Sequence, residues 1–402
     1  MRLEPATPLN HLSDNLPDVP DASQPAGLYI HVPFCQSKCA YCDFYSVTRL
    51  NRIDDYLNAL LIEIDRCQHA IPVADSIYFG GGTPSILPPS QVAKVLDAIQ
   101  TRFPVSDDVE ITLEVNPGTV NKEDLRSLRQ SGVNRLNIGL QSLDDHRLAS
   151  LGRIHTAQAG CMAYDWARSA GFDNVGLDLI YATPGQTLRS WEKEMAGVVC
   201  LKPDHLACYT LTVEHETPLA RQVENGQQHL LDEQTVGDLF DATGSFLQRN
   251  GYRWYEVSNF DHWSPGSPDR RSRHNRKYWN AAPYLGFGPA AHSFLDHTRW
   301  WNHRSLDDYL ADLSAGKRPV TERETLTRDQ QIIESIYLGL RQTEGIDTTR
   351  FAARFNVDFH RHFVRPIDTL VQDGLLETSS ERVRLTRHGM RFLESVVGRM
   401  LG

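Results

Sequence analysis

The chain lacks an excess of basic residues. Its 402 residues include 41 Lys and Arg against 51 Asp and Glu, for a formal net charge of −10. Because affinity for nucleic acid comes largely from Lys and Arg that neutralise phosphates, this balance predicts no nucleic-acid partner. Long apolar runs are missing too, since none reaches the roughly 18 residues that a membrane-spanning helix needs. We therefore expect no integral membrane segment.

The first 26 residues have none of the features of an export or targeting signal. They contain five prolines, a single basic residue and no apolar core, which fits neither a secretory signal nor an Arg-rich transit peptide. We expect residues 1–26 to form a disordered leader on a cytoplasmic protein, and any membrane association to be through partners.

An even set of cysteines, which a disulfide framework would need, is also absent. The chain has seven cysteines and no export signal, which indicates a reducing compartment. Four of them lie apart on segments with regular patterns: Cys67, Cys161, Cys200 and Cys208. We expect these four to be buried, inert thiols.

Short runs rich in β-branched and aromatic residues predict six buried strands. They begin near residues 28, 76, 111, 135, 174 and 205. Helical patterns follow the first three, at 53–67, 89–100 and 121–132, with apolar residues three or four positions apart. Strands that alternate with helices indicate an α/β fold with parallel strands and right-handed crossovers. We therefore predict a partial or full α/β barrel of the TIM type over residues 27–260.

The remainder of the chain predicts two further parts. Residues 261–276 are polar and locally basic and indicate an exposed loop, which opens a barrel-closing segment over 261–320. Beyond it, residues 327–341 have a helical pattern, and 373–389 indicate a short hairpin between helices. Residues 321–402 are therefore predicted to form a small, winged-helix-like domain whose expected role is packing rather than DNA binding.

Three crowded cysteines directly follow the first predicted strand. Cys35, Cys39 and Cys42 are separated by three and then two residues, and Pro33 stiffens the entry to their loop. Thiolates are the usual ligands of iron–sulfur clusters, and three of them on a four-iron cube leave one iron open to a small chelating molecule. A zinc site normally needs a fourth ligand. We therefore predict a 4Fe–4S cluster on these three cysteines.

Polar and glycine-rich motifs end the later strands, where the active face of an α/β barrel lies. The triplet Gly80–Gly82, followed by Thr83, allows a ligand to approach the backbone. The strand-end polar residues are Glu114, Gln141, Arg153 and Asp178. Together they offer donors and acceptors that suit ribose hydroxyls, an amino group and a carboxylate.

The string HNRKYWN combines His274 and Asn275 with the aromatic residues Tyr278 and Trp279 in a predicted loop or short turn. Histidine is a common ligand of haem iron, and flat aromatic rings suit a porphyrin face. A structural motif that closes the barrel is equally compatible with this spacing. Nearby basic residues, at 270, 271, 273 and 276, are either partners for haem propionates or part of a solvated loop.

At these motifs the chain resembles the radical S-adenosylmethionine (SAM) family of oxygen-independent coproporphyrinogen dehydrogenases, and above all its HemW-type haem-chaperone branch. The matching stretches include YIHVPFCQSKCAYCDFYS, YFGGGTPS, EVNPGT, GLQSLDD, GLDLIYATPGQT, EVSNF, HNRKYW and YLGFGPAAHSF. The resemblance implies a 4Fe–4S cluster and a bound SAM. The residues that it places against SAM are Tyr29, Tyr41, Gly81, Gly82, Thr83, Glu114, Gln141, Arg153, Asp178 and Thr212.

Two features of the resemblance favour the chaperone branch. Coproporphyrinogen dehydrogenases carry another cysteine two residues after the third ligand, where this chain has Phe44. The chaperone branch is marked by HNxxYW, which matches here at His274, Asn275, Tyr278 and Trp279. The resemblance thus implies haem binding, delivery to haem proteins of respiration and an electron donor for the cluster, with no assigned catalytic residue. The alternatives are radical decarboxylation of coproporphyrinogen III and a haem-modifying radical methyltransferase.

Overall fold

The structure is a computed structural model, and it describes residues 24–402. The predicted leader lies outside these residues except at positions 24–26. Ala26 already begins the first strand, so the barrel starts one residue earlier than expected. No helix within residues 24–402 is long and apolar enough to cross a membrane.

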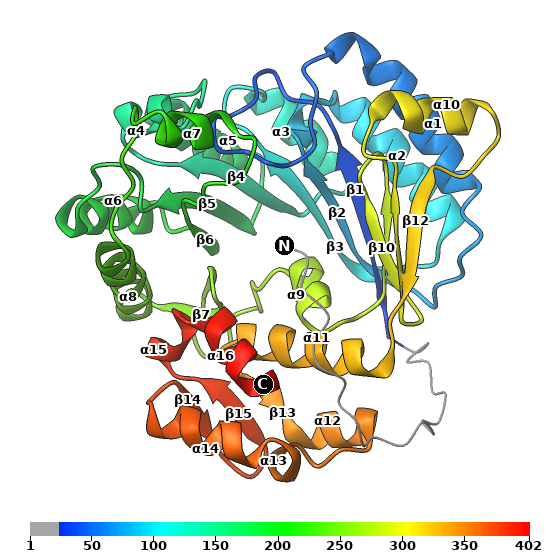
Figure 1. The fold of residues 1–402 in the computed structure, drawn as a ribbon. Coiled ribbons are helices and arrows are strands. Elements are labelled where there is room, and N and C mark those ends of the chain that lie inside the picture. The colour runs from blue at the N-terminus through cyan, green and yellow to red at the C-terminus, as the bar shows by residue number, and fades with distance from the viewer. Residues whose placement is uncertain (1–23) are drawn as a thin grey trace.

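A curved twelve-stranded sheet forms the body of the molecule (Figure 1). The six predicted strands are present as β1 (Ala26–Val32), β2 (Ala74–Gly81), β3 (Val105–Val115), β4 (Arg135–Gln141), β5 (Val175–Tyr181) and β6 (His205–Thr210). They are parallel neighbours in chain order. In β1, Leu28 and Ile30 are fully buried among the apolar core, while Tyr29 between them contacts the rings of Tyr78 and His274. Burial of both sheet faces explains why these strands are continuous apolar runs.

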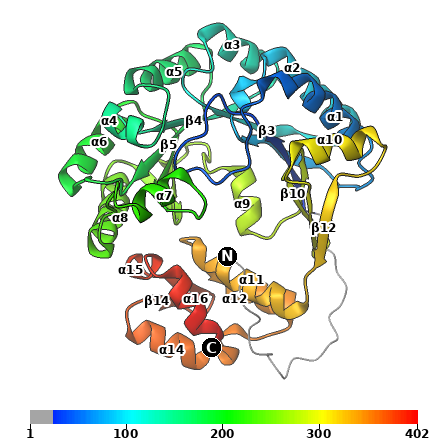
Figure 2. The same cartoon turned by 45° about the horizontal axis from the view of Figure 1, so that its top comes forward.

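Most helices of the barrel cover the convex side of the sheet, and Figure 2 shows α1, α2, α3, α5, α6 and α8 outside the curve while α9 lies within it. Those before β7 are η1 (Leu50–Arg52), α1 (Ile53–Asp65), η2 (Pro84–Ile86), α2 (Pro89–Arg102), α3 (Lys122–Gln130), α4 (Asp145–Ser150), α5 (Ala157–Ser169), α6 (Leu188–Cys200), α7 (Pro218–Glu224) and α8 (Glu233–Arg249). The three predicted helices correspond to α1, α2 and α3. Asn121 and Asp124 cap α3 reciprocally, which accounts for its sharp start.

Further strands extend both edges of this sheet, and all of them are antiparallel to their neighbours except residues 284–287, which run parallel to β1. On one side β6 pairs with β8 (Asn259–His262), which pairs with β7 (Tyr252–Glu256). On the other side lie β9 (Tyr284–Phe287), β10 (His292–Leu295), β11 (Thr298–Asn302) and β12 (Val320–Thr325), with α10 (Leu306–Ser314) before the last. The sheet order ends at β12 and β7, which are not paired with each other. The barrel is therefore open, as predicted.

The C-terminal domain lies below the open side of the barrel (Figures 1 and 2). It comprises α11 (Arg328–Arg341), β13 (Ile346–Asp347), α12 (Thr348–Phe355), α13 (Phe359–His362), α14 (Val364–Gln372), β14 (Leu376–Thr378), β15 (Arg382–Leu385), α15 (Arg387–Met390) and α16 (Leu393–Leu401). The predicted hairpin is β14–β15, which pairs with β13 to form a three-stranded sheet against the helices.

Two expectations about loops and thiols need correction. The predicted exposed loop at 261–276 is shorter, because Asp261 is buried at the end of β8 and residues 273–279 form α9 (Arg273–Trp279). Asp261 forms an ion pair with Arg253, which lies opposite it on β7. The local composition of residues 261–276 gave no sign of this partner. Of the four dispersed cysteines only Cys208 is buried, whereas Cys200 is exposed and the other two are partly buried.

Candidate functional site

The three predicted cluster cysteines lie on the loop that leaves the carboxyl end of β1. The loop is anchored by backbone hydrogen bonds from Cys35 N to Val47 O (3.0 Å) and from Val47 N to Pro33 O (2.7 Å). Farther along, Ala40 N donates to Leu151 O, and Leu219 N donates to Ala40 O. The loop is thus held between segments that follow different strands.

A small apolar cluster packs beneath the middle of this loop. Leu151, Ile180, Leu211 and Leu219 are buried there, and Ala40 and Tyr41 pack against them. These residues follow or end β4, β5 and β6, so the tertiary fold places the loop over the carboxyl ends of the sheet. Packing of this kind, rather than regular secondary structure, orients the cysteines.

The three thiols are close enough to influence one another. Burial raises the pKa of Cys42, and the neighbouring Cys39 and Cys35 raise it further. Among residues 24–402 no three His, Cys, Asp or Glu side chains are arranged to hold a single metal ion. Thiolates are the usual ligands of iron–sulfur clusters, and cluster ligation by these three thiols stays a prediction.

The glycine triplet forms the junction between β2 and the cysteine loop. Gly82 N donates to Val32 O (2.9 Å), and Thr83 N donates to Phe34 O (2.7 Å). A Cβ at Gly82 would lie 2.7 Å from Phe34 O, and one at Gly81 would lie 2.6 Å from the His31 ring. The glycines therefore permit the protein's own backbone to pack closely. The expected approach of a ligand to this backbone stays a prediction.

Arg153 connects the cysteine loop to the strand ends. Its Nη2 donates to Asn116 Oδ1 (2.9 Å) and to Gly139 O (3.0 Å). Its Nη1 lies 3.4 Å from Cys39 Sγ and 3.5 Å from the Tyr41 hydroxyl. This guanidinium places positive charge beside a predicted cluster ligand.

Two acidic residues face the interior beneath these groups. Glu114 accepts a hydrogen bond from the Tyr78 hydroxyl (2.8 Å), and burial raises the pKa of Glu114 to about 7. The pKa of Asp178 is also raised to about 7, first by burial and then by the charge of Glu114. Carboxyls with a pKa in this range exchange protons near neutral pH.

Several polar atoms at this face have no partner among the described residues. They are Gln141 Oε1, Arg153 Nε and Asp178 Oδ1. Buried polar atoms are normally hydrogen-bonded, so unsatisfied atoms on three neighbouring segments indicate that a polar ligand or water completes the site. The residues therefore fit a bound SAM, whose amino, carboxylate and ribose groups require such partners.

The remaining predicted SAM residues lie in three different parts of the molecule. Tyr29 points into the barrel, where its hydroxyl lies 3.2 Å from His31 Nδ1. Tyr41 and Thr83 lie with the cysteine loop, since Thr83 Oγ1 donates to Cys35 Sγ (3.5 Å). Thr212 is exposed just after β6, and no hydrogen bond joins it to the other site residues within 24–402.

Sequence reasoning missed two residues of this network, Asn116 and Tyr78. Asn116 orients Arg153, and Tyr78 donates to Glu114. The signal for Asn116 was available, because it directly follows the third strand in the EVNP string. No local pattern distinguishes Tyr78 from an ordinary strand tyrosine.

The HNRKYW string forms the helix α9 rather than a loop, at the opposite end of the strands. His274 is 1% exposed, with its ring 5.2 Å from that of Tyr78 and 6.2 Å from that of Tyr29. Its Nδ1 lies 3.1 Å from Ser76 Oγ, and its Nε2 lies 2.9 Å from the Tyr278 hydroxyl. Burial lowers the pKa of His274 to about 3, so the imidazole is neutral.

The neighbours of His274 tie α9 to the amino ends of the first strands. Lys277 Nζ donates to Pro25 O (2.7 Å) and pairs with Asp75 (2.6 Å), while Arg273 N donates to Glu110 (2.8 Å). Trp279 packs under the Arg341 guanidinium at 4.2 Å. Of the two roles left open, these contacts favour barrel closure, and iron ligation by His274 stays a prediction.

The other residues of this segment are also engaged within the protein. Asn275 N donates to Ser272 Oγ at the start of α9. The four arginines for which haem propionates and a solvated loop were both open each have acidic neighbours: Arg271 pairs with Asp269 and Glu344, Arg276 with Asp269, Arg273 with Asp108, and Arg270 with Asp173 and Asp204. These arginines therefore stabilise the segment, which makes them less available to propionates.

Comparison with known proteins agrees with this geometry. Residues 29–196 match the radical SAM superfamily, and residues 326–392 match the HemN C-terminal domain. The structure is similar to coproporphyrinogen III oxidase (HemN) from Escherichia coli, with a TM-score of 0.81, 25% identity, and coverage of 94% of this chain and 90% of that one.

Similarity to curated proteins extends over nearly the whole chain. The haem chaperone HemW of Bacillus subtilis is 34% identical, covering 93% of this chain and 98% of that protein. HemW of Mycobacterium tuberculosis is 33% identical, covering 95% and 96%. A mitochondrial radical S-adenosyl methionine domain-containing protein 1 of Danio rerio is 33% identical, covering 82% and 75%. The cysteine loop, the open barrel and these relatives together show that the chain belongs to the HemW family of radical SAM proteins.

Proposed function

We propose that the protein is a haem chaperone, which binds haem and transfers it to acceptor haem proteins while carrying a 4Fe–4S cluster and SAM. The observation that supports this function over decarboxylation is at position 44. Phe44 stands where the dehydrogenases carry a further cysteine, and it is 70% exposed beside the cysteine loop. The names of the nearly full-length relatives point the same way.

Cys35, Cys39 and Cys42 are the residues proposed to hold the cluster. A cluster bound by three thiolates supplies an open iron for SAM and a site for one-electron transfer. The protein's own part is to hold the thiols in place. Arg153 contributes positive charge at Cys39, and Thr83 donates a hydrogen bond to Cys35.

The strand ends are proposed to orient SAM. Gln141 and Asp178 offer acceptor oxygens that lack partners among the described residues. Arg153 offers its unpartnered Nε on the same face, which suits a carboxylate. The glycine junction brings the β2 end and the cysteine loop together, so the proposed cluster and SAM sites share one wall.

Anaerobic, cluster-reconstituted protein supplied with either haem or coproporphyrinogen III tests the proposal. We expect a stable haem complex with a defined Soret band and its transfer to an apo-cytochrome, with no decarboxylated porphyrin product. Phe44→Cys provides a matched comparison. Decarboxylation by the unaltered chain, or methylated haem, would replace the chaperone function by one of the two enzymatic alternatives.

A further inference from the structure

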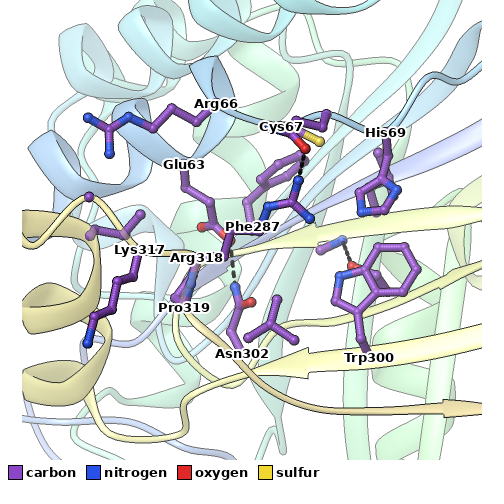
Figure 3. A pocket seen from close by; sticks show the side chains of 17 residues that line it. Glu63, Arg66, Cys67, His69, Phe287, Trp300, Asn302, Lys317, Arg318 and Pro319 are labelled. Atoms are coloured by element: carbon purple, nitrogen blue, oxygen red, sulfur yellow. Dashed lines mark hydrogen bonds between the residues drawn. The ribbon is translucent and has the colours of Figure 1, made fainter.

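A cavity lies away from the cysteine loop, beside the strands that extend the barrel edge (Figure 3). It has a volume of about 300 Å³ and lies between the end of α1, strands β9–β11 and the loop that follows α10. Its wall includes the apolar residues Leu285, Phe287, Leu313 and Val320. None of the residues assigned to the cluster or to SAM lines it.

Three cations border this cavity. Arg66 follows α1, and Lys317 and Arg318 follow α10, and all three are exposed. In Figure 3, Arg66 and Lys317 lie on the side of the cavity opposite His69 and Trp300. Arg318 reaches across the cavity. No carboxylate within residues 24–402 forms an ion pair with any of the three, and Arg318 donates only to the Gln68 side-chain oxygen. This differs from the paired arginines near α9.

The one acidic residue in the cavity wall accepts its hydrogen bonds from neutral donors. Glu63 accepts hydrogen bonds from Asn302 Nδ2 (2.6 Å), Gly288 N (2.8 Å) and the Tyr309 hydroxyl (2.7 Å). Burial raises the pKa of Glu63 to about 7, so this carboxyl is partly protonated at neutral pH. The cavity consequently keeps a cationic rim that suits carboxylates.

An imidazole and an indole form the far wall. The His69 ring stacks on Trp300, with ring centroids 4.5 Å apart and planes at 28°. Neither ring nitrogen of His69 has a hydrogen-bond partner among residues 24–402, and burial with nearby Arg318 lowers the pKa of His69. A neutral imidazole with a free nitrogen is the form that binds iron.

We propose that this cavity is a haem-binding site, in which His69 ligates the iron and Arg66, Lys317 and Arg318 meet the propionates. The inference rests on the proposed function of haem binding. Small-molecule and cofactor pockets span about 300–1,000 Å³. Because this cavity is at the small end of that range, we expect it to enclose only one edge of the haem macrocycle. The exposed remainder of the haem is then accessible to an acceptor protein.

The contrast with His274 supports this assignment. Both ring nitrogens of His274 have partners, and the residue is 1% exposed. His69 is partly exposed, and although its ring stacks on Trp300, neither ring nitrogen has a hydrogen-bond partner among the described residues. Ligation by His69 therefore breaks no hydrogen bond found within the described residues, whereas ligation by His274 breaks at least one.

Titration of anaerobic, cluster-reconstituted full-length protein with ferric haem, followed by Soret absorbance, tests the site. We expect His69→Ala to weaken binding at least tenfold and to shift the Soret band. We expect the pair Lys317→Glu and Arg318→Glu to weaken binding about tenfold without a Soret shift, because exposed charges screen readily and do not touch iron. Matched controls are His146→Ala and the pair Lys122→Glu and Arg126→Glu, all at exposed positions on other helices.

The outcomes separate the site from the function. Wild-type haem binding that is unchanged in both cavity variants overturns the site and leaves the chaperone function standing. Absence of haem binding by the wild-type chain overturns both. Iron content and far-ultraviolet circular dichroism identify a variant that misfolds, and the charge-reversal pair is at surface positions where the fold tolerates change.

Discussion

Unsatisfied polar atoms are the clearest residue-scale sign of a ligand in this molecule. Among residues 24–402, Gln141 Oε1, Arg153 Nε and Asp178 Oδ1 find no partner on the strand-end face. Within the same residues, Thr112 Oγ1 and His205 Nδ1 find none deeper inside the barrel. A buried polar atom without a partner costs about 1–3 kcal/mol, which the fold tolerates where a ligand or water supplies the missing bonds.

The three loop cysteines should account for the iron content of the reconstituted protein. Cys35→Ala, Cys39→Ala or Cys42→Ala should each abolish most bound iron and sulfide, because a cube held by two thiolates is labile. Iron and sulfide assays after anaerobic reconstitution measure this. Cys161→Ala and Cys200→Ala are the controls, and equal iron loss in either would contradict the three-cysteine assignment.

His274→Ala should act on stability rather than on haem. The change leaves the Ser76 and Tyr278 hydroxyls without their partner and opens a cavity beside Tyr78, for an expected loss of about 2–4 kcal/mol in the free energy of unfolding. Denaturant unfolding measures the loss, and haem titration of the folded fraction should match the wild type. A changed Soret band with unaltered stability would instead support iron ligation by His274.

Glu63 should make stability fall as pH rises. Its pKa is about 7 in the folded chain against an ordinary 4.5, so between these values the unfolded chain loses its proton first. The folded state is then penalised by up to about 3 kcal/mol as pH increases from 4.5 to 7, with no further change above. Urea unfolding at several pH values should show that the free energy of unfolding falls less steeply with pH in Glu63→Gln than in the wild type. An unchanged slope would mean that Glu63 is ionised when folded.

At the scale of elements, the end of β2 and the start of the cysteine loop form one packed unit. The β1–β2 register places Val32 opposite Gly81, and the next residue, Gly82, donates to Val32 O. Gly81 also has a φ of 106°, a conformation that favours glycine. The strand end and the loop are therefore coupled through backbone contacts that side chains would disrupt.

Gly82→Ala should lower both stability and cluster occupancy. The added Cβ would lie 2.7 Å from Phe34 O and 2.8 Å from Val32 O, both of which are backbone atoms that move only with the loop. Iron content and thermal unfolding measure the effect. Gly398→Ala in α16 is the matched control, because its Cβ meets open space and should stabilise that helix by about 1 kcal/mol. Full iron content in Gly82→Ala would show that the backbone at this junction shifts to accommodate the added Cβ without loss of the cluster.

At the scale of the whole molecule, one buried ion pair joins the C-terminal domain to the barrel. Arg341 at the end of α11 donates from Nε to Glu256 Oε2 (2.9 Å), and Glu256 at the end of β7 is fully buried. Arg341 also covers the Trp279 ring of α9. The edge strand β7, the helix α9 and the C-terminal domain therefore meet at the Arg341 guanidinium.

Arg341→Ala should weaken the contact between the C-terminal domain and the barrel. It leaves the buried Glu256 carboxylate without its cationic partner, which typically costs about 3–5 kcal/mol. Calorimetry should show a lower unfolding temperature, and limited proteolysis should release the C-terminal domain sooner than in the wild type. Arg384→Ala, whose partner Glu377 is exposed, is the control and should change little. Equal effects of both substitutions would refute the coupling.

The sequence by itself determined the parallel sheet and the cysteine loop. Both are local: strand and helix periods are contained in each segment, and the three cysteines lie within eight consecutive residues. The winged-helix-like domain followed from similar local patterns. Strand-end polar residues were predictable because parallel strands present their carboxyl ends at one edge.

The tertiary structure alone decided the role of each contact between distant segments. His274 meets Ser76, Arg153 meets Asn116 and Glu256 meets Arg341, pairs that no spacing in the chain foretells. The cavity at His69 arises likewise, since α1, β11 and the loop after α10 converge only in the fold. Local periodicity dictates which face of an element is apolar, whereas long-range packing dictates which polar groups find partners and which stay free for a ligand.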